Sequence, residues 1–373
     1  MAKIPFKSIK ELKPVALKGK YVLVRTDFNV PVDQGKVTNN FRLKQALPTL
    51  EYLRRAGARV LVISHTTGPT LKPMALELET FIKAGFSQLI FDDGRFQAMS
   101  NGSVMVLENL RGQVEEEKNS ESLAKRLASL ADIYVNDAFS ASHRRHASIV
   151  SLPKYLPSYA GLNFGREYTE LSKIFKAPKP FTIILGGAKF STKLPLVESL
   201  LPKADHIFVG GALAHTFFRK LGYEIGKSLV EEDMRGLTEL LKNKKIILPT
   251  DVVVKTALGS EIKQLESIRR QDIIVDVGPA TLKQLSKLVR ESKFILWNGP
   301  LGNFEKGFAG GTEKLARIVA RADAYSVVGG GDTVAAIENL KLAEKFNHLS
   351  TAGGAMMEFL ATGTLPGIEA LKL

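Results

Sequence analysis

Short apolar segments recur along the chain, and most are followed by a segment in which apolar residues repeat every three or four positions. The first pattern is typical of strands buried on both faces of a parallel sheet, and the second of helices that cover such a sheet. The alternation therefore predicts an α/β fold. We expect ten strands, over residues 21–27, 59–64, 104–107, 133–136, 182–185, 206–209, 245–248, 273–276, 294–297 and 326–328.

A chain of 373 residues is long enough for two domains of ordinary size. Ten strands divide most simply into two doubly wound parallel sheets, covered by helices such as residues 43–56 and 123–131. A long helical pattern over residues 162–175 ends at the Ala-Pro-Lys-Pro segment of residues 177–180, because proline prevents a helix from continuing. We expect this helix to join the two domains.

The composition excludes several kinds of site. Cysteine is absent, so the chain has no disulfide, no thiolate nucleophile and no cysteine-ligated metal. Residues 1–20 mix lysines with isolated apolar residues and lack the apolar core of a secretory signal, and no uncharged apolar run reaches the roughly 18 residues of a membrane span. We expect a cytoplasmic protein with no membrane partner.

The net charge of +14 raises the question of nucleic-acid binding. The charge is spread over both halves of the chain, with +8 in residues 1–160 and +6 in residues 161–373, and no run of five like charges occurs. A moderate positive potential also attracts small phosphorylated molecules. With no nucleic-acid-binding motif in the sequence, we favour small anions as ligands.

Polar residues cluster directly after the predicted strands, where sheets of this kind bind their ligands. In the first half of the chain the candidates are Asp27, Asn29, Arg42, His65, Arg111, His143, Arg144 and His146. Arginine binds carboxylate and phosphate through paired hydrogen bonds, so this set favours an anionic small molecule. His143 and His146 resemble a metal-binding pair only loosely, since no carboxylate or third histidine stands suitably near them, and we expect no zinc site.

Two glycine-rich segments follow strands in the second half. Gly329-Gly330-Gly331-Asp332-Thr333 opens a helix, where free backbone N–H groups and the helix dipole attract phosphate. Asp332 can hold magnesium there; the alternative is that it simply caps the helix. In Gly186-Gly187-Ala188-Lys189 the lysine is followed four residues later by Lys193, and both would share one face of a helix that began there. This pair suits a polyphosphate; the alternative is two surface lysines.

Nine segments of the chain can be compared together: Val24–Pro31, Glu108–Arg111, Val135–Phe139, His143–Ser148, Gly186–Lys189, Glu224–Ser228, Trp297–Pro300, Gly329–Asp332 and Ser350–Thr351. In this order they resemble the phosphoglycerate kinase family over nearly the whole chain. Each segment alone is weak evidence, whereas nine in sequence order are specific.

The resemblance implies two Rossmann-like domains joined by a long helix and a hinge. Residues 1–161 would bind 3-phosphoglycerate, and residues 361–373 would return to that domain. Residues 162–177 would form the connecting helix, and residues 178–360 would bind MgATP or MgADP. The family is usually monomeric and acts on small molecules, so we expect a monomer with no nucleic-acid partner.

The resemblance also implies the residues of each site. The positions that match the triose site are Asp27, Asn29, Arg42, His65, Arg111 and Arg144. The positions that match the nucleotide site are Gly187, Lys189, Lys193, Gly211, Asn298, Glu305, Gly330, Gly331, Asp332 and Thr333. Glu305 would contact the ribose hydroxyls, and Asp332 would hold magnesium.

In the mechanism that this implies, Arg42 and Lys189 are the catalytic cations, because a loose in-line transition state spreads negative charge over oxygens that fixed cations must stabilise. The carboxylate of 3-phosphoglycerate is itself the nucleophile and is ionised at neutral pH, so no general base is needed. Because the two substrates bind to separate domains, the domains would have to close and exclude water.

The sequence departs from the family pattern at several site positions. Gly68 replaces a triose-site arginine, and Gly112 replaces a phenylalanine-type residue after Arg111. Two functions therefore remain: an active kinase of glycolysis and gluconeogenesis, or a low-activity or inactive relative that binds nucleotides or other proteins. We favour the active kinase, because a mere binding protein has no need of Arg42 and Lys189.

Overall fold

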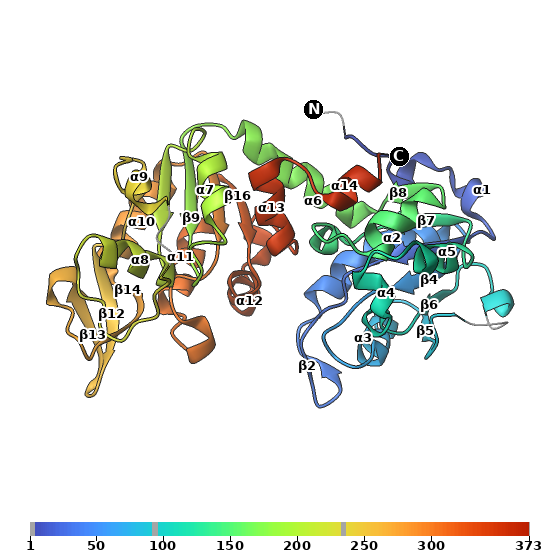
Figure 1. Cartoon of the computed structure of the whole chain (residues 1–373), viewed down its shortest axis with the longest axis horizontal. Coiled ribbons are helices and arrows are strands. Elements are labelled where there is room, and N and C mark those ends of the chain that lie inside the picture. Colours follow the sequence, from blue (N-terminus) through green and yellow to red (C-terminus); the bar gives the residue numbers. More distant parts are fainter. Residues whose placement is uncertain (1–3, 92–95, 233–235, 373) are drawn as a thin grey trace. The chain divides into compact units, whose positions relative to one another are not determined.

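The computed structural model describes residues 4–91, 96–232 and 236–372, and it divides into two compact units (Figure 1). Unit 1 comprises Met1–Thr169 and Thr364–Leu373, and unit 2 comprises Glu170–Gly363. The boundary falls within the helix α6 (Leu162–Ser172). Each unit contains one six-stranded parallel sheet, which confirms the predicted α/β fold with two doubly wound sheets.

The sheet of unit 1 has the strand order β5-β6-β4-β1-β7-β8. Its strands are β1 (Tyr21–Arg25), β4 (Arg59–Ile63), β5 (Ala84–Phe86), β6 (Val104–Val106), β7 (Ile133–Asn136) and β8 (Ser158–Ala160), and β2 (Val32–Asp33) pairs with β3 (Lys36–Val37) in a separate hairpin. Besides α6, the helices of this unit are α1 (Pro14–Leu17), α2 (Phe41–Arg55), α3 (Lys72–Glu79), α4 (Val114–Glu117), α5 (Glu121–Ala128) and α14 (Pro366–Ala370).

Both faces of this sheet are buried, as the apolar strand sequences predict. Successive side chains of a strand point to opposite faces. Val22 and Val24 of β1 therefore pack in one cluster with residues of α2 and α3, and Leu23 packs in another with residues of α5. The C-terminal helix α14 also belongs to this unit: Gly367 N–H donates to the Ser142 carbonyl oxygen at 2.8 Å.

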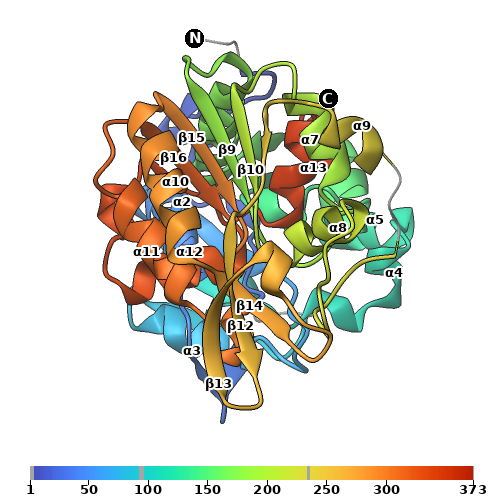
Figure 2. The same ribbon diagram turned by 90° about the vertical axis from the view of Figure 1, so that its left-hand side faces the viewer.

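The sheet of unit 2 has the strand order β11-β10-β9-β15-β16-β17. Its strands are β9 (Phe181–Leu185), β10 (His206–Val209), β11 (Ile246–Ile247), β15 (Phe294–Asn298), β16 (Tyr325–Gly329) and β17 (His348–Leu349). The helices are α7 (Leu194–Leu200), α8 (Ala212–Lys220), α9 (Leu237–Leu241), α10 (Pro279–Glu291), α11 (Gly310–Val319), α12 (Gly331–Asn339) and α13 (Gly354–Thr362). Figure 2 shows α10, α11 and α12 on one side of the sheet and α7, α8 and α13 on the other.

One of the ten predicted strands does not belong to either parallel sheet. Residues 273–276 lie in β14 (Ile273–Val277), which pairs antiparallel with β12 (Asp251–Thr256). Strand β12 also pairs antiparallel with β13 (Gly259–Gln264), so the three strands form a separate small sheet. The apolar run of β14 resembles a parallel strand because its side chains pack against neighbouring elements on both faces: four of its five residues are buried.

The sequence interpretation also missed several short strands. β5, β8 and β17 contain only two or three residues each, too few to show a distinct apolar pattern. Strand β13 is mostly exposed and reads as a polar loop. Within the described residues, no helix is both long and apolar enough to cross a bilayer.

Candidate active site

In each sheet, the order of the strands reverses at the strand that comes first in the chain, because the following strands are added on both sides of it. In unit 1, β1 lies between β4 and β7, and in unit 2, β9 lies between β10 and β15. Ligands of doubly wound sheets bind at the carboxyl ends of strands at this point. The loops after β1 and β9 are therefore the expected binding loops.

In unit 1, the loop after β1 is held in a fixed shape by Asp27. The Asp27 carboxylate accepts hydrogen bonds from Arg42 Nη1 at 2.5 Å, from Asn29 N–H at 3.0 Å and from the Ser140 hydroxyl. Burial alone would raise the pKa of Asp27, but Arg42 and these hydrogen bonds hold it below its usual value. The Asn29 side-chain oxygen accepts from Thr67 N–H at 3.1 Å, which joins this loop to the loop after β4.

His65 lies in the loop directly after β4, among several cations. Burial and the neighbouring Arg25 lower its pKa to about 3, and Arg144 and Arg111 act in the same direction, whereas Asp27 opposes them. His65 is thus uncharged at neutral pH. The structure therefore brings together all six residues predicted for the triose site, with Arg111 and Arg144 near enough to affect the charge of His65.

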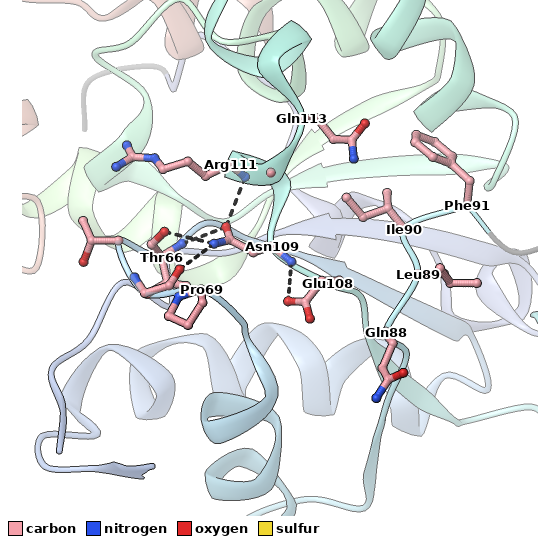
Figure 3. A pocket seen from close by; sticks show the side chains of 13 residues that line it. Thr66, Pro69, Gln88, Leu89, Ile90, Phe91, Glu108, Asn109, Arg111 and Gln113 are labelled. Atoms are coloured by element: carbon pink, nitrogen blue, oxygen red, sulfur yellow. Dashed lines mark hydrogen bonds between the residues drawn. The ribbon is translucent and has the colours of Figure 1, made fainter. Parts of the chain in front are cut away.

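A cavity of about 480 Å³ lies beside Arg111 (Figure 3). Two of the departures from the family pattern, Gly68 and Gly112, line it. A Cβ atom added to Gly112 would contact nothing within 4 Å, and one added to Gly68 would contact only Thr66 Oγ1 at 3.6 Å. Two cations that follow Gly68 in the sequence, Lys72 and Arg95, are candidates to replace the missing arginine. Lys72 is not among the described residues that line this cavity, and Arg95 lies outside the described residues.

The histidines that resembled a metal pair have other neighbours. His146 Nδ1 lies 3.9 Å from Glu116 Oε1, and Arg144 Nε donates to His143 Nε2 at 3.4 Å. Over the described ranges, no group of three or more His, Cys, Asp or Glu side chains is arranged to hold a metal.

In unit 2, the loops after β9 and β15 touch through their backbones. Gly187 N–H donates to the Pro300 carbonyl at 2.8 Å, and Gly187 has a φ of +90°. A Cβ atom on Gly211 would lie 2.7 Å from Gly187 N, so only glycine fits there. These contacts bring three glycine-containing loops to one edge of the sheet.

The two lysines of this site have different environments. Helix α7 begins only at Leu194, so the prediction that Lys189 and Lys193 share one helical face is wrong: the intervening residues form turns. Lys193 is buried, and its Nζ donates to the carbonyl oxygens of Gly186 and Asn298, the latter at 3.2 Å. Burial lowers the pKa of Lys193 to about 8. Lys189 is exposed and has no ion-pair partner among the described side chains.

Two polar residues in the first turn of α12, Asp332 and Thr333, do not cap the helix. Gly330 is the N-cap residue, and no side chain caps the helix, so Asp332 does not serve as a helix cap. Thr333 Oγ1 is buried and has no hydrogen-bond partner in the part of the chain that is described. Burial and the nearby Glu305 raise the pKa of Asp332.

A cavity of about 540 Å³ adjoins these loops. Of the predicted nucleotide-site residues, Gly187, Gly211, Glu305 and Asp332 line it. Sequence reasoning missed several lining residues, including His215, Lys227, Leu229, Asp276 and Phe304. His215 is buried, and its Nδ1 lies 2.7 Å from the Leu229 carbonyl, to which it donates. Only its position in the fold identifies His215, because an isolated histidine on an apolar helix has no sequence signal for a site.

Comparison with known proteins agrees with this geometry. The family model of phosphoglycerate kinase matches residues 12–363. The phosphoglycerate kinase of Dictyoglomus turgidum is 42% identical, over 98% of this chain and 99% of that protein. That of Moorella thermoacetica is 43% identical, over 96% of this chain and 98% of that protein.

The chain belongs to the phosphoglycerate kinase family.

Solved structures of the phosphoglycerate kinase family have the same fold. The phosphoglycerate kinase structure from Coxiella burnetii has a TM-score of 0.84 and 37% identity, and it covers 98% of this chain and 99% of its own. The one from Pyrococcus horikoshii has a TM-score of 0.88 and 30% identity, with 98% of each chain covered. Phosphoglycerate kinases are phosphotransferases, so family membership makes this chain a kinase of that class.

Asp276, on the wall of the larger cavity, makes the stability of this chain depend on pH. Its carboxylate accepts from Gly311 N–H at 2.7 Å and Val277 N–H at 2.8 Å. Burial nevertheless raises the pKa of Asp276 to about 6, well above the usual range of an aspartate. The folded state therefore binds this proton more tightly than the unfolded state does. The associated stability is fully present below about pH 4 and is lost as pH rises through 6.

We predict that Asp276→Asn gains free energy of unfolding relative to the wild type as pH rises, by about 2–3 kcal/mol between pH 4 and pH 7, because asparagine has no proton to lose. Urea unfolding of both proteins at pH 4, 5, 6 and 7 measures the difference. A difference that stays constant over this range would contradict the raised pKa.

Proposed function

We propose that this chain catalyses reversible phosphoryl transfer between MgATP and 3-phosphoglycerate, with 1,3-bisphosphoglycerate and MgADP as the products. The supporting observation is the pair of strand-end sites in a member of this family: a cation-rich one in unit 1 and a glycine-rich one in unit 2. In this proposal, the domain boundaries follow the resemblance: residues 1–161 and 361–373 bind the triose, residues 162–177 connect, and residues 178–360 bind the nucleotide. The enzyme works as a cytoplasmic monomer without nucleic-acid or membrane partners.

In the triose site, Arg42, Arg111 and Arg144 bind the anionic groups of 3-phosphoglycerate. Arg42 Nη1 donates to the Asp27 carboxylate at 2.5 Å and to the Asn29 carbonyl oxygen at 3.4 Å, which orients the guanidinium and leaves Nε and Nη2 for substrate. Asn29 and His65 complete the site with uncharged groups. A site with three arginines beside two uncharged polar groups suits a substrate that has both a carboxylate and a phosphate.

In the nucleotide site, Gly187, Gly211, Gly330 and Gly331 let the backbone approach the phosphates closely. Glu305 contacts the ribose hydroxyls, and Asn298 and Thr333 offer polar groups at the strand ends. Lys193 acts through the backbone and not by contact with the nucleotide, since its ammonium donates to the carbonyl oxygens of Gly186 and Asn298 at the ends of β9 and β15. Its role is to fix these loops beneath the nucleotide.

The carboxylate of Asp332 lines the larger cavity in the first turn of α12 and would hold the magnesium ion of MgATP or MgADP. The raised pKa of Asp332 fits this role, because two facing carboxylates gain from a cation placed near them. When bound, the ion neutralises charge on the phosphate oxygens.

The chemical step needs cations at the transferring group. The carboxylate oxygen of 3-phosphoglycerate attacks the γ-phosphorus of ATP, and the bond from that phosphorus to the bridging oxygen of ADP breaks, so the electron pair leaves with ADP. Arg42 and Lys189 stabilise the negative charge that spreads over the transferring oxygens. Because the substrates bind to different units, transfer occurs only when the units come together around both of them.

The second candidate is a low-activity relative that binds nucleotide. Gly68 and Gly112 favour it, because they open a cavity beside Arg111 where the family has larger side chains. Both sites keep their predicted catalytic cations, and Lys189 has no structural partner among the described side chains that would otherwise explain it. We therefore place the active kinase first.

We predict that Lys189→Ala lowers kcat by at least a hundredfold, because a cation that acts on the transition state is lost. A coupled assay with 3-phosphoglycerate and MgATP measures it. Lys220→Ala, at an exposed lysine at the end of α8, is the matched control and should leave kcat unchanged. Unchanged turnover in folded Lys189→Ala would remove this residue from the mechanism.

We predict that Gly68→Arg lowers KM for 3-phosphoglycerate by roughly 10- to 100-fold, the effect of one added charge-assisted hydrogen bond. The backbone accepts the change, since the nearest atom to an added Cβ is Thr66 Oγ1 at 3.6 Å. Lys72→Ala and Arg95→Ala test whether another cation already compensates for the missing arginine. No change in any of the three variants would show that this loop does not contact the substrate.

A further inference from the structure

A buried polar row lies behind His65 and belongs to neither predicted set of site residues. Arg25, the last residue of β1, is fully buried, and Glu116 and Ser148 are buried beside it. A buried arginine is costly unless its donors are satisfied, so each of its contacts matters.

The Arg25 guanidinium is fixed at all three nitrogens. Its Nε donates to Ser148 Oγ at 2.8 Å, and its Nη1 donates to the Thr26 carbonyl at 2.5 Å. Its Nη2 lies 3.2 Å from His65 Nδ1. The guanidinium therefore has one defined orientation, with one edge directed at the His65 ring.

Glu116 supplies the counter-charge and fixes the middle of the row. Its carboxylate accepts from Ser148 N–H at 2.9 Å and from the Ser148 hydroxyl at 2.5 Å, and it lies 4.0 Å from Arg25 Nη2. Tyr134 donates its hydroxyl to the Ser148 carbonyl at 2.5 Å. Ser148 is thus held by three partners and cannot turn away from Arg25.

The chemistry of the guanidinium determines which nitrogen of His65 carries the proton. Arginine has five donors and no acceptor, and it stays protonated in proteins. His65 Nδ1 must therefore be the acceptor in the contact with Arg25, so the proton of the neutral ring lies on Nε2. Among the described residues, Nε2 has no hydrogen-bond partner, which leaves its N–H for a ligand.

We propose that Arg25 is a positioning residue that holds His65 as its neutral Nε2–H tautomer, so that the site offers the substrate a fixed uncharged donor among its arginines. This inference rests on the proposed function, in which 3-phosphoglycerate binds in unit 1. It concerns a residue that touches His65 and not the substrate.

The charges around His65 agree with a neutral ring. Burial is the largest cause of its lowered pKa, followed by Arg25, and Arg144 and Arg111 lower it further, whereas Asp27 raises it. A protonated ring would place one more positive charge beside these arginines in a buried site. The neutral ring instead orients a substrate oxygen through one directional bond, while the arginines supply the charge.

The first test measures the tautomer in the wild-type protein. Two-bond ¹H–¹⁵N NMR of the wild type, with the His65 signals assigned by comparison with His65→Gln, shows which ring nitrogen is protonated. The inference predicts an unprotonated Nδ1 and a protonated Nε2 throughout pH 5 to 8. A protonated Nδ1, or a ring that titrates within this range, would overturn it.

The second test removes the contact. Arg25→Met/Glu116→Gln removes both buried charges together, because deleting one alone leaves an unpaired buried charge. In this variant we expect His65 to populate both tautomers and to titrate at higher pH. We also expect KM for 3-phosphoglycerate to rise about tenfold, the effect of one poorly oriented hydrogen bond to a charged group, with KM for MgATP unchanged.

Arg59→Met is the matched control. Arg59, at the start of β4, stacks over the Tyr21 ring at 5.0 Å and donates to its hydroxyl at 3.1 Å. This variant also loses a partly buried arginine of the same sheet, so it should lower stability without changing the His65 tautomer or either KM. Equal changes in both variants would reduce Arg25 to a structural role.

The two proposals can fail separately. The NMR measurement in the absence of substrate tests the tautomer whether or not the protein turns over 3-phosphoglycerate. Normal turnover with a Nδ1-protonated His65 would overturn this inference alone, whereas the predicted tautomer without turnover would overturn the proposed function alone.

Discussion

Close backbone contact at the strand ends of unit 2 is the constraint on which its site depends. A Cβ atom on Gly186 would lie 2.1 Å from the Pro300 carbonyl oxygen, and one on Gly299 would lie 2.4 Å from the Gly186 carbonyl oxygen. Side chains are excluded there, so the loops after β9 and β15 meet backbone to backbone. The buried Lys193 ammonium then binds carbonyl oxygens from both strand ends, which keeps the loops together.

Unit 1 uses a buried cation in a similar way. Arg25 is fully buried behind the strand ends and binds the Thr26 carbonyl and His65, while Arg42 is partly exposed at the front. In both units a buried cation thus fixes the loops, and an exposed or half-exposed cation, Arg42 or Lys189, remains available to a ligand. Burial separates the two roles, because the inner cation is surrounded by protein and donates to backbone and side-chain groups, not to a ligand.

The sequence was sufficient to predict the parallel sheets, because strands such as β9 and β15 are buried on both faces and are therefore continuously apolar. It was misleading for β14, whose apolar run is equally well buried in an antiparallel sheet. Pairing partners depend on contacts between distant residues, and a single-sequence pattern does not contain them. The helix near Lys189 begins later than the pattern suggests for a different, local reason: the glycines and turn residues before Leu194 compete with helix formation.

Some of the candidate site residues could be predicted from the sequence, whereas others could be found only in the structure. Residues next to strand ends, such as Asp27 and Asp332, could be found from their position in the pattern. His215 and Arg25 could not, because each acts through its place in the folded structure and stands in an apolar segment of the sequence. The open space beside Gly68 and Gly112 also needed the structure, since the two positions are far apart in the chain and line one cavity.

Hydrogen–deuterium exchange of the wild type with each ligand alone tests the central claim most directly, that each sheet edge binds one substrate. With 3-phosphoglycerate, the account predicts slower exchange in residues 27–29, 65–68 and 109–111, and none in unit 2. With MgADP, it predicts slower exchange in residues 186–193, 298–305 and 330–333, and none in residues 27–111. Protection by either ligand in the other unit, or no protection by either, would contradict it.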